Sequence, residues 1–251
     1  MNEDKSIKIL FRISRALVGK QSLEEVLMQI VACAADLIDS KICSLLLLSP
    51  DKKELAIRAT QSLSAAYRQK PPVRVEQSVT GRAVIEKRVI VVADVTKEPG
   101  FGYPEIAKRE ELKSLLVVPL MIGDEVIGGL NCYTTTLRNF SEEEIQLMQI
   151  IANYAAIAIE HMRVVQEESQ ARLALETRKS VDNAKRILVK RYKMTEEGCH
   201  RLLQKMSMER NKPLKEIADA IILSTDLPER PCLHLLNSFK GRPIPFNPLK
   251  G

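Results

Sequence analysis

The sequence predicts an α+β fold in which helices flank an antiparallel sheet at both ends. Three observations predict it. Short apolar runs separated by turn residues fill the first half of the chain, serine capping boxes open two helices, and a long helix leads into a basic helical segment. We divide the 251 residues into a first domain (1–162), a helical domain (163–225) and a proline-rich tail (226–251). A long helix (141–192) connects the two domains.

Two helices are expected before the first strand. In residues 5–19, the spacing of three and four between Ile7, Leu10, Ser14 and Leu17 predicts a helix. A second helix opens with the capping box Ser22-Leu-Glu-Glu25. Its predicted inner face contains Val26, Ile30, Cys33 and Leu37.

Apolar runs that follow these helices predict the strands of the sheet. Residues 43–49 and 54–60 are joined by a Pro50-Asp51 turn and form a predicted hairpin. Further strands are expected at 89–93, 112–122 and 125–135. The last two are separated by Gly123-Asp124, a pair typical of tight turns.

The long helix opens with a second capping box at Ser141-Glu-Glu-Glu144. Steps of three and four residues then separate its apolar positions, which is the heptad spacing of coiled coils. Because this spacing continues to Leu173, beyond the expected sheet, we predict a homodimer. The alternative is a helix packed against its own sheet. The predicted dimer interface contains Ile145, Met148, Ala152, Ala155, Ile159 and Met162.

The formal charge of +6 is concentrated in the last third of the chain. Residues 163–225 contain 14 Lys and Arg against 9 Asp and Glu, a balance of +5, whereas residues 1–162 contain 20 against 21. A basic segment of this kind favours a polyanionic partner, although a solvated helix surface has the same composition.

The five cysteines are widely spaced and form no CxxC pair, which predicts reduced thiols in a cytoplasmic protein. We interpret Cys33, Cys43 and Cys132 as small buried apolar residues. No secretory signal and no apolar run long enough to span a membrane is visible. No phosphate loop, nucleophile motif or metal-ligand cluster was found, so we predict neither catalysis nor a metal site.

Two segments of the first domain, SVTGRAVIEKRVIVVADV (78–95) and SLLVVPLMIGDEVIGGLNCY (114–133), resemble GAF domains, which are small-molecule sensors of bacterial regulators. The resemblance implies a ligand pocket roofed by loops and short helices. No cofactor is identified, because residues 60–112 contain neither the cysteine of bilin-binding domains nor a histidine for haem. The pocket aromatics can also simply fill the space. The predicted pocket residues are Tyr67, Thr80, Arg82, Phe101 and Tyr103.

The basic segment resembles the ANTAR domain, a three-helix RNA-binding module of bacterial antiterminators. The matching residues include Ala184-Lys185, Met194-Thr195-Glu196-Glu197, Leu202-Leu203 and Ile217-Ala218. Arg186 and Cys199 depart from the usual glycine and alanine of the family. From the charges we assign RNA contacts to Lys179, Lys185, Arg186, Lys190, Arg191, Arg201, Lys205, Asn211 and Lys212.

Together the two resemblances imply a signal-responsive antiterminator that binds paired hairpins in nascent RNA. Its expected partners are RNA, a second copy of the chain, and a small-molecule ligand or an upstream signalling protein. Two alternatives remain open at this point. One is a DNA-binding transcriptional regulator, and the other is a GAF-type methionine sulfoxide reductase.

Overall fold

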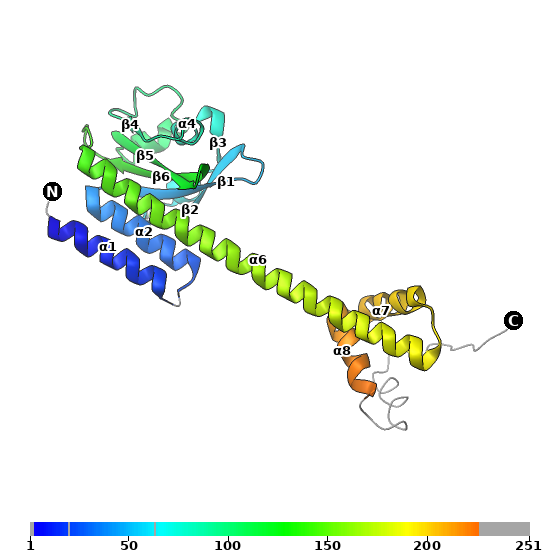
Figure 1. The fold of residues 1–251 in the computed structure, drawn as a ribbon. Helices are drawn as coiled ribbons and strands as arrows, with labels where there is room; N and C mark the ends of the chain where they lie inside the picture. The colour runs from blue at the N-terminus through cyan, green and yellow to red at the C-terminus, as the bar shows by residue number, and fades with distance from the viewer. Residues whose placement is uncertain (1–2, 20, 63, 226–251) are drawn as a thin grey trace. The chain divides into compact units, whose positions relative to one another are not determined.

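The computed structural model describes residues 3–19, 21–62 and 64–225, so the predicted tail at 226–251 lies outside the described residues. The chain forms two compact units, Met1–Val164 and Val165–Gly251. One helix, α6 (Glu142–Tyr192), contributes residues to both units (Figure 1). Each unit is described by itself below.

The first unit contains a six-stranded antiparallel sheet with the strand order β3-β2-β1-β6-β5-β4. Five of the strands correspond to predicted runs, and the hairpin at 43–60 is confirmed. The two-residue strand β3 was not predicted. The strands are β1 (Ile42–Leu48), β2 (Glu54–Thr60), β3 (Val73–Arg74), β4 (Ile90–Val92), β5 (Ser114–Ile122) and β6 (Glu125–Thr134).

Helices cover the two faces of this sheet differently. On one face lie α1 (Glu3–Val18), α2 (Leu23–Ile38) and the first part of α6 (Figure 1). The other face carries α3 (Ala65–Arg68), the 3-10 turn Val75–Gln77, α4 (Val79–Glu86) and α5 (Pro104–Arg109). Successive side chains of a strand point to opposite faces, so the sheet separates two apolar cores. Cys43 and Cys132 face the core that contains α1, α2 and α6, whereas Ile42 and Tyr133 face the core that contains α4.

The predicted start of α2 is confirmed, because Ser22 and Glu25 form a reciprocal capping box. The helix predicted at residues 5–19 is present as α1. Ile7 is 66% exposed, and the buried residues are Ile9, Ile13 and Ala16. Two sets of residues in this helix are spaced by three and four positions. The spacing alone does not decide which set packs against the core. The side chains of Leu10 and Leu17 lie outside the described residues.

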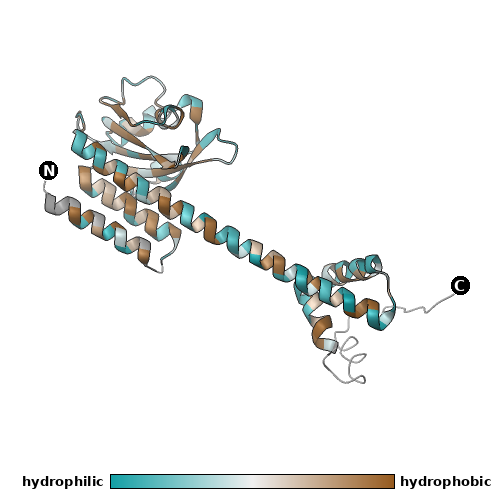
Figure 2. Ribbon diagram, viewed as in Figure 1, coloured by the Kyte–Doolittle hydropathy of each residue, from teal (hydrophilic) through white to brown (hydrophobic). Residues whose placement is uncertain are grey.

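The assignment of three α6 heptad residues, Met148, Ala152 and Ala155, to a dimer interface is wrong. Met148, Ala152 and Ala155 are fully buried in the core of their own unit, and Ile145 and Ile159 pack against that core. Met162 is partly exposed. The heptad spacing therefore reflects packing of α6 on its own domain, and the alanines allow the helix to approach closely. Hydrophobic residues are visible along both α2 and the first part of α6 (Figure 2).

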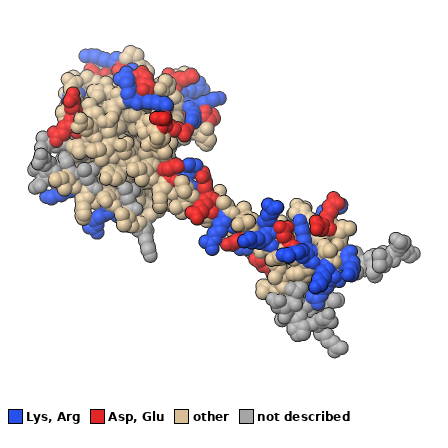
Figure 3. Space-filling model, viewed as in Figure 1, with Lys and Arg blue, Asp and Glu red and all other residues tan. Residues whose placement is uncertain are grey.

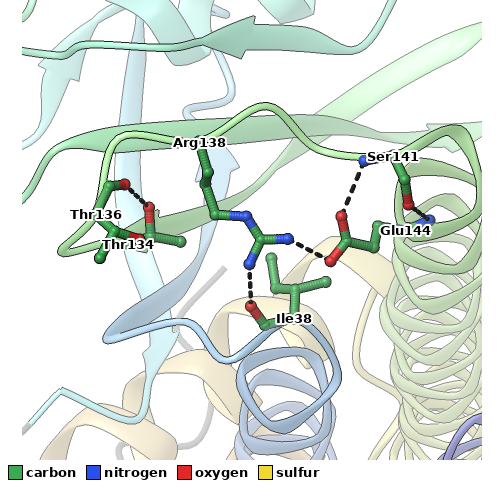
Figure 4. A network of polar contacts seen from close by, with 6 residues as sticks. All are labelled: Ile38, Thr134, Thr136, Arg138, Ser141 and Glu144. Carbon is green, nitrogen blue, oxygen red and sulfur yellow. Dashed lines mark hydrogen bonds and ion pairs between the residues drawn. The ribbon is translucent and has the colours of Figure 1, made fainter. Parts of the chain in front are cut away.

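A polar network fixes the start of α6 to the end of α2 (Figure 4). Arg138 donates from Nη1 to the Ile38 carbonyl over 3.1 Å and forms an ion pair with Glu144 through Nη2. Glu144 also accepts from the Ser141 backbone N–H over 2.9 Å, while its own N–H donates to the Ser141 hydroxyl. The predicted capping box at Ser141 is thus present and is extended by Arg138.

The second unit is a small helical module. Its helices are the last part of α6, α7 (Glu196–Arg210) and α8 (Leu214–Thr225). Thr195 caps α7 as predicted, since its hydroxyl accepts from the Gly198 N–H. The buried residues of its core are Val181, Ala184, Leu188, Cys199, Leu203, Ile217, Ala218 and Ile221. Over the described part of the chain, we find no helix with the length and apolar character of a membrane span.

Candidate functional site

A cavity of about 30 Å³ lies on the α4 side of the sheet. The sheet supplies its floor, and α3, α4, α5 and the loop before α5 supply its walls. Four of the predicted pocket residues, Tyr67, Thr80, Phe101 and Tyr103, line it. Arg82 does not, and this part of the prediction is wrong. Its guanidinium instead forms an ion pair with Glu98 over 2.8 Å.

Aromatic rings form the apolar part of the cavity wall. Tyr67 is 1% exposed, and its hydroxyl and that of Ser44 are hydrogen-bonded over 2.8 Å. The rings of Tyr67 and Phe101 each meet that of Tyr133 edge to face, with centroids 6.1 and 6.2 Å apart. Burial raises the pKa of Tyr67 well above its ordinary value and that of Tyr133 to about 12, so both stay neutral.

Lys70 and Asn131 are among the polar cavity residues that were not predicted from the sequence. Lys70 places its Nζ 4.2 Å from the ring centroid of Tyr67 and 5.4 Å from that of Tyr103. Burial lowers the pKa of Lys70 to about 8. Asn131 is 1% exposed and donates from Nδ2 to the Thr80 hydroxyl over 2.7 Å. Within the described residues its Oδ1 has no hydrogen-bond partner.

Glycines let α4 approach its neighbours at the cavity, Gly81 towards the 3-10 turn and Gly129 on the sheet towards Thr80. A Cβ on Gly81 would lie 1.8 Å from the Val75 carbonyl oxygen, and one on Gly129 would lie 2.8 Å from the Thr80 methyl. Both separations are far below contact distance. The N-terminal turn of α4, from Ser78 to Thr80, therefore lines the cavity only because these positions lack side chains.

The cysteines of the first unit lie away from the cavity. Cys43 and Cys132 are cross-strand partners on the face that packs against α2 and α6, and their Sγ atoms are 3.0 Å apart. Burial raises the pKa of Cys43 well above its ordinary value. Cys33 is also fully buried, as expected for a small apolar core residue. Cys232 lies outside the described residues.

The second unit carries a basic stripe on the last part of α6 (Figure 3). Lys179, Arg186 and Lys190 are exposed, and their helical spacing places them opposite the buried residues Val181 and Leu188. Arg186 donates to Asn183 on the same helix. Within the described part of the chain, neither Lys179 nor Lys190 forms a salt bridge. Arg191 is also exposed, and Lys185 is half-buried.

The basic residues predicted to contact RNA on α7 and in the turn after it each form an ion pair with a glutamate. Arg201 pairs with Glu197 over 3.3 Å, Lys205 with Glu209 over 3.8 Å and Lys212 with Glu216 over 3.0 Å. Asn211 has a structural role, because it ends α7 in a left-handed conformation with a φ of 49°. Its side chain remains exposed.

An exposed aromatic residue stands within the same basic region. Tyr192 ends α6 between Arg191 and Lys193 and is 46% exposed. Aromatic side chains among lysines and arginines stack on unpaired bases. The pattern KRYK at 190–193 contained this signal, but the sequence analysis considered only its charges.

Two family models match the chain. The model of the GAF domain matches residues 20–160, which is more than half of the chain. The chain belongs to the GAF domain family. The model of the ANTAR domain matches residues 169–222, so an ANTAR domain follows the GAF domain. The cavity lies in the GAF domain, and the basic stripe lies in the ANTAR domain.

Two relatives match part of this chain. One is the Methyl sulfide methyltransferase-associated sensor of Methanosarcina acetivorans, 29% identical over 61% of this chain and 16% of the relative. The other is a phosphoenolpyruvate-dependent phosphotransferase system protein of Salmonella typhimurium, 24% identical over 62% of this chain and 21% of the relative. The match thus spans less than a quarter of either relative.

Solved structures share the GAF fold. The GAF domain of a phosphoenolpyruvate-protein phosphotransferase from Coxiella burnetii has a TM-score of 0.60 and 23% identity, over 66% of this chain and 99% of that one. Free methionine-R-sulfoxide reductase from Neisseria meningitidis, in complex with its substrate, has a TM-score of 0.56 and 20% identity, over 66% and 95%. At these identities the likeness concerns the fold.

Proposed function

We propose that this GAF–ANTAR protein is a signal-responsive antitermination regulator that binds paired hairpins in nascent RNA. The ANTAR domain at 169–222 carries this proposal. A GAF sensor joined to an ANTAR domain implies a signal-controlled RNA-binding antiterminator. Held by the ANTAR domain, the hairpins would keep a terminator from forming in the transcript.

The lysines of the basic stripe that form no salt bridge within the described residues support an RNA-binding face on α6. Lys179 and Lys190 have no acidic partner within the described residues, so they meet phosphates without first breaking an ion pair. Arg201 and Lys205 must give up Glu197 and Glu209 to do so. Tyr192 adds a stacking surface for loop bases. We therefore place the centre of the RNA-binding face on the last turns of α6.

Dimerisation remains part of the proposal, but through different residues. Ile150, Ile157 and Val164 are spaced by seven along α6 and are 40%, 58% and 47% exposed. This spacing is that of residues in a coiled-coil interface, here with α6 of a second copy of the chain. Two ANTAR domains in one dimer would bind two hairpins of one transcript, and the second contact would gain from effective concentration.

Sensing is proposed to act through α6, which belongs to both units. A ligand changes the behaviour of α6 only if it binds two states of the GAF domain with different affinity. RNA affinity measured with and without ligand would report this coupling directly.

A catalytic role is the second function that the fold raises, because one solved neighbour is a free methionine-R-sulfoxide reductase. That chemistry needs thiols beside the substrate. Here Cys43 and Cys132 lie on the sheet face opposite the cavity. We therefore propose a regulator without reductase activity. Thiol-dependent reduction of free methionine sulfoxide by the purified protein would contradict this.

Charge reversal tests the RNA-binding face. Lys190→Glu should weaken hairpin binding at least tenfold and reduce the salt dependence of binding, since a phosphate contact is replaced by repulsion. Lys205→Glu should have a smaller effect, and Lys53→Glu in the GAF hairpin turn should have none. Equal affinity of wild type and Lys190→Glu would show that the face is misplaced.

A further inference from the structure

The amide of Asn131 is the first sign of a missing partner in the GAF cavity. It is almost fully buried, and only its Nδ2 is satisfied, by the Thr80 hydroxyl. If the amide is turned over, Thr80 donates to Oδ1 and Nδ2 becomes the unpaired atom. In either orientation one end of this buried amide lacks a partner among the described residues, which is unfavourable. A ligand with a suitable polar group would supply that partner.

Lys70 supplies a positive charge at the same cavity. Of the described residues that line it, Lys70 alone is charged, and within the described residues it forms no salt bridge. Its ammonium is held between the rings of Tyr67 and Tyr103. Cation–π contacts attract the ammonium but leave its charge without a counter-ion.

The start of α4 adds further attraction for negative charge. Ser78, Val79 and Thr80 line the cavity. The first amides of a helix lack intrahelical acceptors and carry partial positive charge. The Ser78 hydroxyl accepts from the Gly81 N–H over 3.0 Å and so satisfies one of these amides.

The dimensions of the cavity restrict the ligand to a few non-hydrogen atoms. Its volume is about 30 Å³. That volume is a small multiple of the roughly 10–15 Å³ that a single water needs, so the cavity suits a small organic anion and not a large ligand. A nucleotide or a fused-ring cofactor does not fit this cavity, and Lys70 disfavours a cation.

We propose that the GAF cavity binds a small carboxylate that also carries a hydroxyl or amino group. The carboxylate pairs with Lys70 at the α4 N-terminus, and the second group hydrogen-bonds to the free end of the Asn131 amide. This inference specifies the signal of the proposed regulator and rests on that proposal for its biological role. The binding itself is a property of the GAF cavity.

Calorimetric titration of the full chain with three probes of similar size tests the inference. Glycolate has both groups, acetate lacks the hydroxyl, and glycolamide lacks the charge. We expect glycolate to bind, acetate to bind about tenfold more weakly, and glycolamide not to bind measurably. Equal binding of glycolate and acetate would overturn the role of Asn131, and equal binding of glycolamide would overturn that of Lys70.

Two variants test whether glycolate affinity depends on the charge of Lys70 or on the net charge of the protein. Lys70→Met should lower glycolate affinity at least tenfold, whereas the matched control Lys53→Met should leave it unchanged. The melting temperature of each variant establishes that it is folded. If Lys70→Met melts cooperatively and binds glycolate like wild type, the proposal is overturned.

The pH dependence gives a second readout. The titratable groups that face the Lys70 ammonium are Tyr67 and Tyr103, and Tyr133 also lines the cavity. The pKa of each tyrosine is raised by burial, so all remain neutral between pH 6 and 9. The pKa of Lys70 is about 8. Glycolate affinity should therefore be constant below about pH 7 and fall towards tenfold per pH unit above about pH 8.

Lys70→Arg keeps its charge over this range, so its affinity should not fall. A wild-type affinity that is flat to pH 9.5 would contradict the assignment.

Hairpin binding by the same preparation, without probe, distinguishes the two proposals. If none of the probes binds while the folded protein binds hairpin RNA, the carboxylate proposal fails and the antiterminator proposal stands. If glycolate binds but hairpin RNA does not, the proposed function fails and the cavity assignment stands.

Discussion

Replacing Arg138 by methionine tests the network that joins α2 to α6. The side chains of Arg138 and Glu144 are 28% and 15% exposed. Removal of the guanidinium leaves the Ile38 carbonyl without this donor and leaves Glu144 with only the Ser141 N–H. A hydrogen bond to a charged group contributes about 1.5–3 kcal/mol, and breaking a fully buried ion pair costs about 3–5 kcal/mol. For this partly buried pair we expect a loss of about 2 kcal/mol.

The assay is urea unfolding followed by the near-ultraviolet circular dichroism of the tyrosines. Arg58→Met is the matched control, because Arg58 and Glu24 also form an ion pair but are 45% and 59% exposed. Such exposed pairs contribute about 0.2–1 kcal/mol. In a thermal scan, 2 kcal/mol corresponds to about 4–8 °C for a domain of this size. An Arg138→Met variant no less stable than Arg58→Met would refute the reasoning.

The same network predicts a dependence on pH. Burial raises the pKa of Glu144, but the hydrogen bonds from Arg138 and from the Ser141 N–H outweigh it, and the pKa is lowered. A lowered carboxyl pKa contributes stability above the unfolded value, and this contribution is lost as the pH falls through the folded value. The stability difference between wild type and Arg138→Met should therefore shrink between about pH 5 and pH 3.

Three further outcomes follow from the packing. Gly81→Ala should destabilise the GAF domain by about 2 kcal/mol or more in urea, because its Cβ would meet the Val75 carbonyl oxygen; an unchanged midpoint would contradict this. Cys43 and Cys132 should resist iodoacetamide in the folded protein at pH 7.5 and react after unfolding, as mass spectrometry would show, because burial excludes the reagent. Ile157→Glu should convert the proposed dimer to a monomer in sedimentation velocity, and a dimer of unchanged stability would exclude this interface.

Much of the fold was predictable because its signals are local. Capping at Ser22 and Thr195 depends on residues three positions apart, and the strand runs at 43–60 and 112–135 are bounded by turn residues. The heptad positions Met148 and Ala152 were assigned wrongly because a coiled coil and a helix on its own sheet share the same spacing. Only the tertiary structure shows which face of α6 is covered.

The polar residues of the cavity could not all be predicted from local sequence patterns. Asn131 stands within an apolar strand two positions before Tyr133, and strand alternation places both on one face. That alternation was a usable signal. The sequence around Lys70 contains no such signal. Its place near the rings of Tyr67 and Tyr103 depends on segments that only the fold brings together. Arg82 was predicted because it is a polar residue of the region 60–112, but its guanidinium forms an ion pair with Glu98.

The central claim is that the ANTAR domain recognises paired hairpins in RNA. Its most direct test is filter binding of the full chain to three ligands over a range of salt concentrations: an RNA with two hairpins, the same RNA with one hairpin deleted, and duplex DNA. We predict tightest binding to the two-hairpin RNA, a marked loss when one hairpin is removed, and a linear fall of log affinity with log salt. Equal binding of duplex DNA, or no loss with a single hairpin, would contradict the account.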